Sequence, residues 1–528
     1  MQNISKEIFE FKQLQQQFSA QYESVFPDRM AEKTVVIIPS LTLDQEILAK
    51  IDGVIHYEER LLCLLMLLRM PNTHVVYVTS MPVHNIIMDY YLHLLPGITN
   101  YHARQRLTTL SCFDTSAKSL TQKILERPRL IERIRKSIPQ GHVSHMACFN
   151  VTEAERALAV KLKMPIYGCD PGLLYLGTKN FSRKIFKECN IDTPPGFEDC
   201  NTEEDIINSL FSLKTTFPEL NKAVVKLNDG FSGDGNAVFS FEGAPGNEYL
   251  QLWIKEVLTQ RLQIVAHDLV YECFMEKFRM MGGIVEAFID GEEKAFPSVQ
   301  CRITPLGETD VISTHDQVIG GEMGHVFLGA HFPASKEYTV SIGELGKRIT
   351  EKLKSYGVLG RFSIDFISVK ENNEWKHFAI EINLRKGGTT HPFLMLQYLT
   401  EGDYDASKGM YLTATGQPRY YFFSDNLQSE YYKGLTPHDL IEITTANDLL
   451  YNGSTQQGVM FHMIGALSQY GKLGILCIGA TTEITIELYN KTVEVLNREK
   501  QDEKYDEINN YNTLTITGVR PAEPLLAL

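Results

Sequence analysis

Hydrophobic runs alternate with helical patterns in the first part of the chain. TVVIIPSL (34–41) and HVVYVTS (74–80) are predicted strands, whereas EERLLCLLMLLRM (58–70) and NIIMDYYLHLL (85–95) are predicted helices. Strands that alternate with helices indicate an α/β arrangement around a parallel sheet. Segments with helix patterns and segments with strand patterns continue to about residue 400, so we expect α/β and α+β regions in the same chain.

The clearest strand pattern, with polar and apolar residues alternating at a period of two, occurs twice. In GRFSIDFISV (360–369) one face would carry three polar residues: Arg361, Ser363 and Asp365. In AIEINLRKGGTTHP (379–392) the polar face would hold Glu381, Asn383 and Arg385, and the apolar face Ile380, Ile382 and Leu384. A helix is expected to begin at Thr390, His391 or Pro392.

A polar turn, KENNEW (370–375), separates these two strands and predicts a hairpin. A register symmetric about Asn373 would set Asp365 opposite Glu381, Ser363 opposite Asn383, and Arg361 opposite Arg385. Two carboxylates and an amide on one face suit Mg²⁺, which binds one or two carboxylates together with substrate phosphates. The alternative is a solvated sheet face with ion pairs across the strands.

A glycine-rich turn is a candidate for phosphate binding. AVVKLNDGFSGDGNAVF (223–239) predicts a strand that ends at Lys226, a loop with Gly230, Gly233 and Gly235, and a second strand. Glycines let backbone N–H groups turn toward phosphate oxygens, and the lysine adds positive charge. The residue order excludes a Walker A loop and a protein-kinase loop. A plain turn remains the alternative.

The overall charge narrows the class of protein. With 51 basic and 65 acidic residues the net charge is −14, which argues against a nucleic-acid-binding protein. The basic amphipathic segment 119–138, which Pro128 interrupts, is therefore interpreted as a solvated helix face. A hydrophobic content of 43% and a charged content of 22% are typical of a soluble globular protein. Nine scattered cysteines without a CxxC motif predict reduced thiols.

No targeting or membrane segment is expected. The first residues are charged and lack the apolar core of a secretory leader. The longest apolar run, 61–68, is far shorter than the about 20 residues that cross a bilayer. We therefore expect a cytoplasmic protein without a membrane partner.

The order of the motifs, a lysine and a glycine loop followed by Asp365 and by Glu-x-Asn-x-Arg at 381–385, resembles the ATP-grasp family of carboxylate–amine ligases. GTKNFSRKIFKECNIDTPPGF (177–197) is similar to the segment with that family's first nucleotide-facing lysine, here Lys179. GGIVEAFIDGEE (282–293) is similar to the strand and hinge against which adenine lies. The resemblance implies an ATP-grasp fold with ATP and Mg²⁺ as cofactors.

The resemblance also assigns roles residue by residue. The ATP contacts that it implies are Lys179, Lys226, Gly230, Ser232 and Gly233 at the phosphates, Glu286, Ala287 and Ile289 at the hinge and adenine, and Glu293 at the ribose. Two Mg²⁺ ions, or Mn²⁺ in their place, would be bound by Asp365, Glu381 and Asn383. Arg385 would neutralise the transferring phosphoryl group or the acylphosphate.

Three further segments are similar to the peptide ligases of the pheganomycin type: PSVQCRITP (297–305), STHDQVIGG (313–321) and EINLRKGGTTHPFLMLQYLT (381–400). Segments before and after these three are also similar to that group, so the resemblance covers most of residues 34–495. It implies a Rossmann-like pre-ATP-grasp domain (1–168), an ATP-grasp domain (169–400) with a glycine-loop subdomain (about 195–290), a small α/β C-terminal domain (401–498) and a loosely ordered tail (499–528).

Substrate residues are predicted from strand positions. Ser298, Gln300 and Arg302 would share a face, and Arg302 could hold an acyl carboxylate or an oxyanion. His315, followed by Asp316, is a candidate base for the incoming amine, with a hydrogen-bonded loop histidine as an equal alternative.

The remaining candidates have less specific roles. Arg361 and Lys386 are expected to contact the substrate. His391 is a weaker candidate than His315, and His462 is interpreted as structural. Residues 57–60 (YEER) match the group and are interpreted as lying at a domain interface.

The implied activity is ATP-dependent ligation through an acylphosphate, with release of ADP and phosphate. Its partners would be small amino-acid or peptide substrates, and a homodimer is left open. Two alternatives stand beside it: a small-molecule kinase on the same fold, and a non-catalytic ATP-binding regulator. The regulator is disfavoured because the lysines, the carboxylates, Asn383 and Arg385 are all present.

Overall fold

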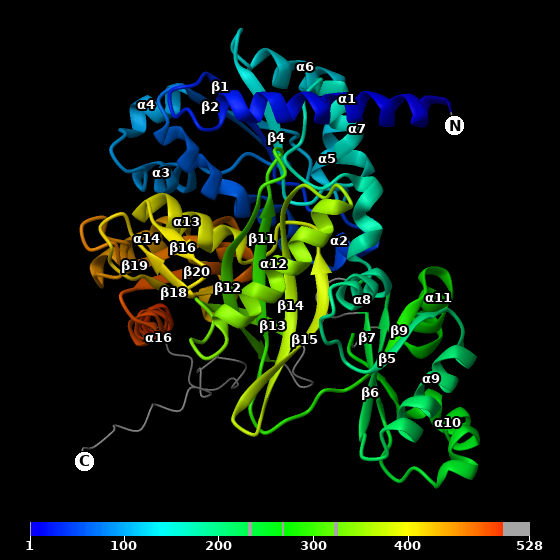
Figure 1. Cartoon of the computed structure of the whole chain (residues 1–528). Helices are drawn as coiled ribbons and strands as arrows, with labels where there is room; N and C mark the ends of the chain where they lie inside the picture. The colour runs from blue at the N-terminus through cyan, green and yellow to red at the C-terminus, as the bar shows by residue number, and fades with distance from the viewer. Residues whose placement is uncertain (1, 231–234, 267–268, 321–325, 500–528) are drawn as a thin grey trace, which may run out of the picture.

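The computed structural model describes residues 2–230, 235–266, 269–320 and 326–499 (Figure 1). The predicted contacts of Ser232 and Gly233 and almost all of the predicted tail lie outside the described residues. Among the described helices, none combines the length and the apolar character needed to cross a bilayer.

The N-terminal part is a parallel four-stranded sheet with helices around it, as the alternating pattern predicts (Figure 1). The strand order is β3-β2-β1-β4, with β1 (Lys33–Ile38), β2 (Thr73–Thr79), β3 (Leu107–Ser111) and β4 (Val143–Cys148). The helices are α1 (Gln2–Val25), α2 (Gln45–Lys50), α3 (Asn85–His93), α4 (Asn100–Gln105), α5 (Leu120–Leu125), α6 (Pro128–Lys136) and α7 (Glu153–Leu162). The predicted basic helix 119–138 is two helices, because Pro128 lacks the N–H for a helix interior and takes the first position of α6.

The predicted helix at 58–70 is a 3₁₀-helix, η1 (Val54–Arg69). In this winding residues three apart lie on the same side. Tyr57 and Arg60 therefore share one side of η1, while His56 and Glu59 share another. The side chains of adjacent residues on η1 therefore line two different cavities.

The centre of the molecule is an antiparallel sheet in the order β10-β14-β11-β12-β13-β18-β20-β19, with β15 on the other side of β14 (Figure 1). Its strands are β10 (Lys294–Ala295), β11 (Pro297–Ile303), β12 (Thr309–Gly320), β13 (Val326–Phe332), β14 (Gly360–Glu371), β15 (Glu374–Asn383), β18 (Tyr420–Gln428), β19 (Gly458–His462) and β20 (Lys472–Gly479). Helix α12 (Thr339–Ser355) packs on β11 and β12 and encloses an apolar core under the sheet.

The β14–β15 hairpin has the predicted pairs Asp365–Glu381 and Ser363–Asn383, but it reaches them by an unpredicted route. Its turn is formed by Asn372 and Asn373, both with positive φ, which centres the first part of the ladder between these two residues. A β-bulge after Asp365 then shifts the register by one residue. The pairing ends at Asn383, so the predicted pair Arg361–Arg385 is wrong and Arg361 lies opposite Arg302 on β11 instead.

The glycine-rich segment belongs to a separate sheet in the order β5-β9-β6-β7-β8, antiparallel throughout. Its strands are β5 (Gly196–Cys200), β6 (Lys222–Leu227), β7 (Asn236–Ser240), β8 (Leu262–Ile264) and β9 (Gly283–Ala287). It has its own apolar core with α9 (Glu203–Thr216), α10 (Asn247–Arg261) and α11 (Tyr271–Met281). Helix α8 (Lys179–Glu188), which follows η2 (Pro171–Gly177), contacts β15 of the central sheet and β9 of this one.

The C-terminal strands continue the central sheet, because β18 pairs with β13 and β20 with β18. The other elements of this part are α13 (Thr390–Thr400), β16 (Asp403–Asp405), β17 (Met410–Leu412), η3 (Glu430–Tyr432), α14 (Pro437–Ala446), η4 (Ile464–Ala466), α15 (Leu467–Tyr470) and α16 (Thr482–Arg498). One apolar core joins them to η1 and to one face of the N-terminal sheet. The boundary predicted at 400 stays a prediction, although in space the two sides of it share one sheet.

Candidate active site

A cleft of about 490 Å³ lies where the central sheet, the glycine-rich sheet and η1 meet. Eight of the predicted site residues line it: Lys179, Lys226, Gly230, Ser298, Asp365, Glu381, Asn383 and Arg385. They come from segments far apart in the sequence, so the fold brings together the two motifs that the sequence analysis found separately.

The carboxylates of Asp365 and Glu381 stand opposite each other in the hairpin ladder. Burial and the charge of Glu381 raise the pKa of Asp365 to about 6. Burial alone would raise the pKa of Glu381 as well, but the charge of Lys179, which forms an ion pair with it, makes the net direction downward. The two carboxylates are thus close enough to repel each other.

This donor set fits a divalent cation. Asn383 donates its amide N–H to the Asp365 Oδ2 at 2.9 Å and lies on the same face as both carboxylates. A cation between the carboxylates would relieve the repulsion that the raised pKa of Asp365 reports. Two carboxylates and an amide leave further coordination positions for phosphate oxygens and water, as Mg²⁺ requires.

The bulge in β15 also changes one predicted side chain. Ile380, expected on the apolar face of the strand, lines the cleft beside Glu381, while Ala379 and Ile382 lie in the core beneath the sheet. The extra residue of a bulge breaks the alternation of the strand, so two successive side chains face the same side.

The two lysines are held by carboxylates from different sheets. The ammonium of Lys179, at the start of α8, pairs with Glu381, and the Lys226 Nζ lies 2.5 Å from the Glu286 Oε1. Glu286 is buried and also accepts a 2.8 Å hydrogen bond from Arg183. A charge network therefore fixes both ammonium groups at the phosphate side of the cleft.

The predicted adenine hinge follows β9. The Ala287 N–H donates to the Pro195 carbonyl at 2.7 Å, and the Ile289 carbonyl accepts from the Lys294 Nζ at 2.6 Å. Glu293 is exposed, with its Oε2 3.4 Å from the Lys370 Nζ. The nucleotide roles of these residues stay predictions.

Arg385 lies in the cleft at the end of the metal-binding strand. Burial lowers the pKa of its guanidinium, and the nearby charges of Glu381 and Asp365 act in the opposite direction. The loop that follows contributes Gly387, Gly388 and Thr389 to the cleft wall before α13 begins at Thr390, as predicted. The Thr389 side chain bonds to Gln300 rather than capping the helix.

Five predicted substrate or catalytic residues do not line the cleft, and one of them, Gln300, is buried with its amide bonded to Thr389. His315 is completely buried on β12, where its Nε2 lies 2.5 Å from the Tyr421 hydroxyl and burial lowers its pKa to about 3. Its neighbour Asp316 bonds to Tyr338 and to the Ser335 N–H. Arg302 pairs with Asp310 at 2.6 Å on the neighbouring strand.

Arg361 and Lys386 lie beneath η1, near Cys63, and also do not line the cleft. The Lys386 Nζ donates to the Cys148 carbonyl at 2.5 Å, and burial lowers its pKa to about 8. Arg302 and Arg361 lie opposite each other on the predicted face of β11 and β14, but the sheet extends past the cleft, so this face is open at one end and covered at the other.

The cleft lining also includes polar and charged residues that the motif search did not assign to the site, among them Tyr57, Arg60, Asp425, Asn426 and Lys472. Tyr57 and Arg60 were interpreted as lying at a domain interface; in the structure Tyr57 bonds to Lys472 and Arg60 pairs with Asp425. A carboxylate within the apolar strand YYFFSDNLQ (420–428) is the one signal that could have marked Asp425.

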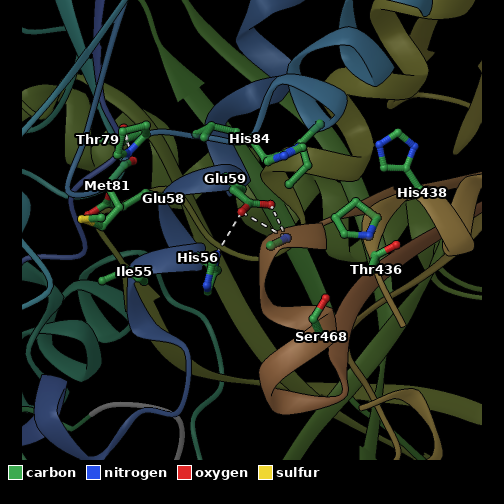
Figure 2. Close-up of a pocket in the computed structure, with 15 residues that line it drawn as sticks. Ile55, His56, Glu58, Glu59, Thr79, Met81, His84, Thr436, His438 and Ser468 are labelled. Carbon is green, nitrogen blue, oxygen red and sulfur yellow. Dashed lines mark hydrogen bonds and ion pairs between the residues drawn. The ribbon is translucent and has the colours of Figure 1, made fainter. Parts of the chain in front are cut away.

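A second cavity of about 420 Å³ lies on the His56–Glu59 side of η1 (Figure 2). Figure 2 shows the Glu59 carboxylate beside His56. The same carboxylate accepts a hydrogen bond from the backbone N–H of Gly465 at 3.1 Å. Glu58 is fully buried against Ser80, and burial raises its pKa to about 7. The bonds of Glu58 and Glu59 thus hold η1 in place on the side of the second cavity. Tyr57 and Arg60 face the first cleft.

Comparison with known families matches two parts of the chain. Residues 173–243 and 247–407 match a family described as IQCH-like, ATP-grasp, and residues 439–492 match a family described as PGM1 C-terminal domain.

Two relatives are similar over much of the chain. An L-propargylglycine–L-glutamate ligase of Streptantibioticus cattleyicolor is 26% identical over 474 residues, which are 88% of this chain and 94% of that protein. The IQ motif-containing protein H of Danio rerio is 24% identical over 399 residues, 67% of this chain and 38% of that protein.

Solved structures share the fold. The biotin carboxylase of Campylobacter jejuni has a TM-score of 0.53 at 11% identity, covering 88% of this chain and 91% of that one. The biotin carboxylase domain of the Hydrogenobacter thermophilus 2-oxoglutarate carboxylase has a TM-score of 0.51 at 12% identity, covering 88% and 89%. At this identity the likeness concerns the fold alone.

Proposed function

We propose that this chain, which matches an ATP-grasp family over residues 173–243 and 247–407, is an ATP-dependent ligase that joins a carboxylate to an amine. The acid and the amine are both amino acids or short peptides. The ligase relative, which aligns over 94% of its length, supports this class of reaction. The observation that carries the proposal is the convergence of Asp365, Glu381 and Arg385 with two lysines in one cleft.

The reaction has two steps. An oxygen of the substrate carboxylate attacks the γ-phosphorus of ATP, the bond to the β-phosphate oxygen breaks, and ADP leaves with that electron pair. The amine nitrogen then attacks the acyl carbon, the carbon–oxygen bond to phosphate breaks, and the nitrogen loses a proton as the amide forms. Phosphate and ADP are the by-products.

The protein's part is mainly positioning and charge neutralisation, as in other phosphoryl transfers. Lys179 and Lys226 would hold the α- and β-phosphates, and the backbone around Gly230 would approach them closely. Asp365, Glu381 and Asn383 would hold two Mg²⁺ ions, which neutralise charge on the β- and γ-phosphates. Arg385 would bind the transferring phosphoryl group with its planar donors.

ADP release tests this proposal. The protein is incubated with Mg-ATP and a panel of amino acids and dipeptides, singly and in pairs. We expect turnover that requires a pair and yields an amide. Turnover with a single compound and a stable phosphorylated product would replace the ligase with a kinase.

A further inference from the structure

The end of the cleft away from Lys179 and Lys226 is built from three segments that lie outside the residues matched to the ATP-grasp family. Tyr57 and Arg60 come from η1, Asp425 and Asn426 from β18, and Lys472 from the start of β20. They share one cavity with Arg385 and the metal-binding face. A substrate at this end would therefore lie beside the group expected to bind the reacting phosphoryl oxygen atoms.

Asp425 provides a fixed negative charge here. Its Oδ2 lies 2.8 Å from the Arg60 Nη2, and its Oδ1 lies 2.6 Å from the Nε2 of the fully buried His462. Burial would raise the pKa of Asp425, but the charge of Arg60 and the bond from His462 lower it, so the carboxylate is ionised.

The approach to this carboxylate is kept open by a glycine. A Cβ at Gly388 would lie 3.2 Å from the Asp425 Oδ2, whereas the hydrogen of the glycine leaves that space to the cleft. Gly388 is three residues from Arg385, so the open side of Asp425 faces the same loop that follows the reacting region.

Lys472 provides a positive charge without an acidic partner in the described part of the chain. Its Nζ bonds to the Tyr57 hydroxyl at 3.1 Å and lies 5.4 Å from the centre of that ring. A cation that lines a cleft and has only a phenol as neighbour can accept an anionic ligand without breaking an ion pair.

The backbone that carries Arg60 is fixed from both sides. His391 donates from Nδ1 to the Arg60 carbonyl at 2.9 Å and stacks on His462 at 4.3 Å, and Glu59 bonds to Gly465 behind η1. The Nε of Arg60 is buried and has no hydrogen-bond partner among the described residues. Its guanidinium stacks on the Tyr57 ring at 4.2 Å. The subsite is thus preorganised, with one N–H left over.

We propose that this corner binds the substrate that supplies the amine, and that this substrate is a free α-amino acid. Asp425 takes its ammonium group, on the side of Gly388 and Arg385, and this group loses one proton to solvent before the nitrogen attacks and a second as the amide forms. Lys472, together with Tyr57, takes its α-carboxylate. An α-amino acid carries these two charges a few bonds apart, and the chain of contacts Asp425–Arg60–Tyr57–Lys472 places the groups that would bind them in one corner of the cleft. The inference rests on the proposed ligase function and adds the residues that select the amine.

The test compares α-amino acids with their α-carboxamides as amine donors, for the full-length protein and for Lys472→Gln. The probes are the twenty standard L-amino acids and their carboxamides, each with Mg-ATP and the acid found in the ADP-release panel. The wild-type protein should prefer an amino acid over its carboxamide at least about tenfold in KM. Lys472→Gln should lose this preference by raising KM for the amino acid only.

Two variants separate binding from structure. Lys491→Gln, on the exposed side of α16, is the matched control and should retain the preference. Asp425→Asn should raise KM for both kinds of donor while KM for ATP stays unchanged. If Arg60 and Asp425 merely tie two parts of the molecule together, Asp425→Asn would lower thermal stability and leave both KM values for the donors unchanged, which would overturn the proposal.

Failure of this inference differs from failure of the ligase proposal. Turnover with an amine other than an α-amino acid, or an unchanged amino-acid preference in Lys472→Gln, would sink the subsite and leave the ligase standing. No turnover with any pair would remove the ligase function, and with it this inference.

Discussion

The two ends of the cleft are assembled in different ways. The phosphate end uses a lysine at the start of a helix, a lysine before a glycine loop, and one strand with acid and amide at alternate positions that is followed by an arginine. The other end takes one or two residues each from η1, β18 and β20, and η1 lies far from the two strands in the sequence. The first end is built from local patterns and the second from topology.

This difference explains what each end can do. Groups on one strand keep a fixed spacing, which suits a ligand with a constant shape such as the phosphates of ATP. Groups on separate segments can change one at a time, which suits the part of a substrate that differs between related enzymes. We therefore expect changes at the first end to abolish turnover and changes at the second to alter substrate preference.

Glu381→Gln should have the largest effect, because it removes one of two opposing carboxylates from the phosphate end. We expect ADP release to fall by about 10³-fold or more, as when a preorganised electrostatic group is lost. Glu374→Gln, at the exposed start of the same strand, should leave turnover unchanged. Equal rates for both variants would remove Glu381 from the catalytic machinery.

Glu58→Gln tests the support of the other end through pH. The pKa of Glu58 is raised from 4.5 to about 7, so the folded protein holds this proton more tightly than the unfolded chain does. The wild-type protein should therefore lose stability relative to the variant as pH rises from about 4.5 to 7, by up to about 3 kcal/mol.

Urea unfolding midpoints of both proteins at pH 5 and pH 8 measure this difference. The advantage of Glu58→Gln should be larger at pH 8. Glu46→Gln, on the exposed side of α2, should show the same midpoint relative to the wild type at both values. A pH-independent difference for Glu58→Gln would mean that Glu58 is ionised in the folded protein throughout.

Lys226→Met sharpens the comparison within the phosphate end. It removes one charge-assisted contact with the nucleotide, which should raise KM for ATP about tenfold while KM for the amine stays the same. Lys222→Met, at the exposed far end of β6, is the control. A rise in the KM of the amine instead would mean that the two ends are not independent.

Glu293→Gln should have the smallest effect. An exposed carboxylate that bonds to ribose hydroxyls contributes little, so KM for ATP should rise about threefold. A matched change at the neighbouring exposed Glu292 should not alter it. If 2′-deoxy-ATP is used as readily as ATP by the wild-type protein, Glu293 does not bind the ribose.

The phosphate end could be predicted because its side chains follow a period of two. The predicted pair Asp365–Glu381 was correct only because a bulge offset a register error of one residue that followed from the expected centre of the turn. A regular hairpin centred between Asn372 and Asn373 would have set Asp365 opposite Ile380 and turned Glu381 into the core. The bulge restores the pair Asp365–Glu381 at the cost of placing Ile380 in the cleft. Periodicity alone carries no information on a bulge.

The period-of-two argument was wrong for residues on the part of the sheet face that lies outside the cleft. Arg302 and Arg361 occupy the predicted face, but the elements that cover it there come from distant parts of the chain. His315 was a fair candidate from its residue type, yet the stretch Ile312–His315 of its strand is buried on both faces, which no short motif reveals. Lys472 and Asp425 line the cleft but were not predicted. They come together with Tyr57 and Arg60 only because β18, β20 and η1 meet in the fold.

The pairing of β13 with β18 has a consequence for motion. Because backbone hydrogen bonds join the C-terminal strands to the sheet that carries Asp365 and Glu381, the amine-binding corner and the metal-binding face cannot separate without breaking a strand pair. The five-stranded sheet with the glycine loop has no such pairing with its neighbours in the described residues. We therefore expect a movement around a nucleotide to shift the five-stranded sheet relative to the central sheet, because no strand pair among the described residues holds these two sheets together.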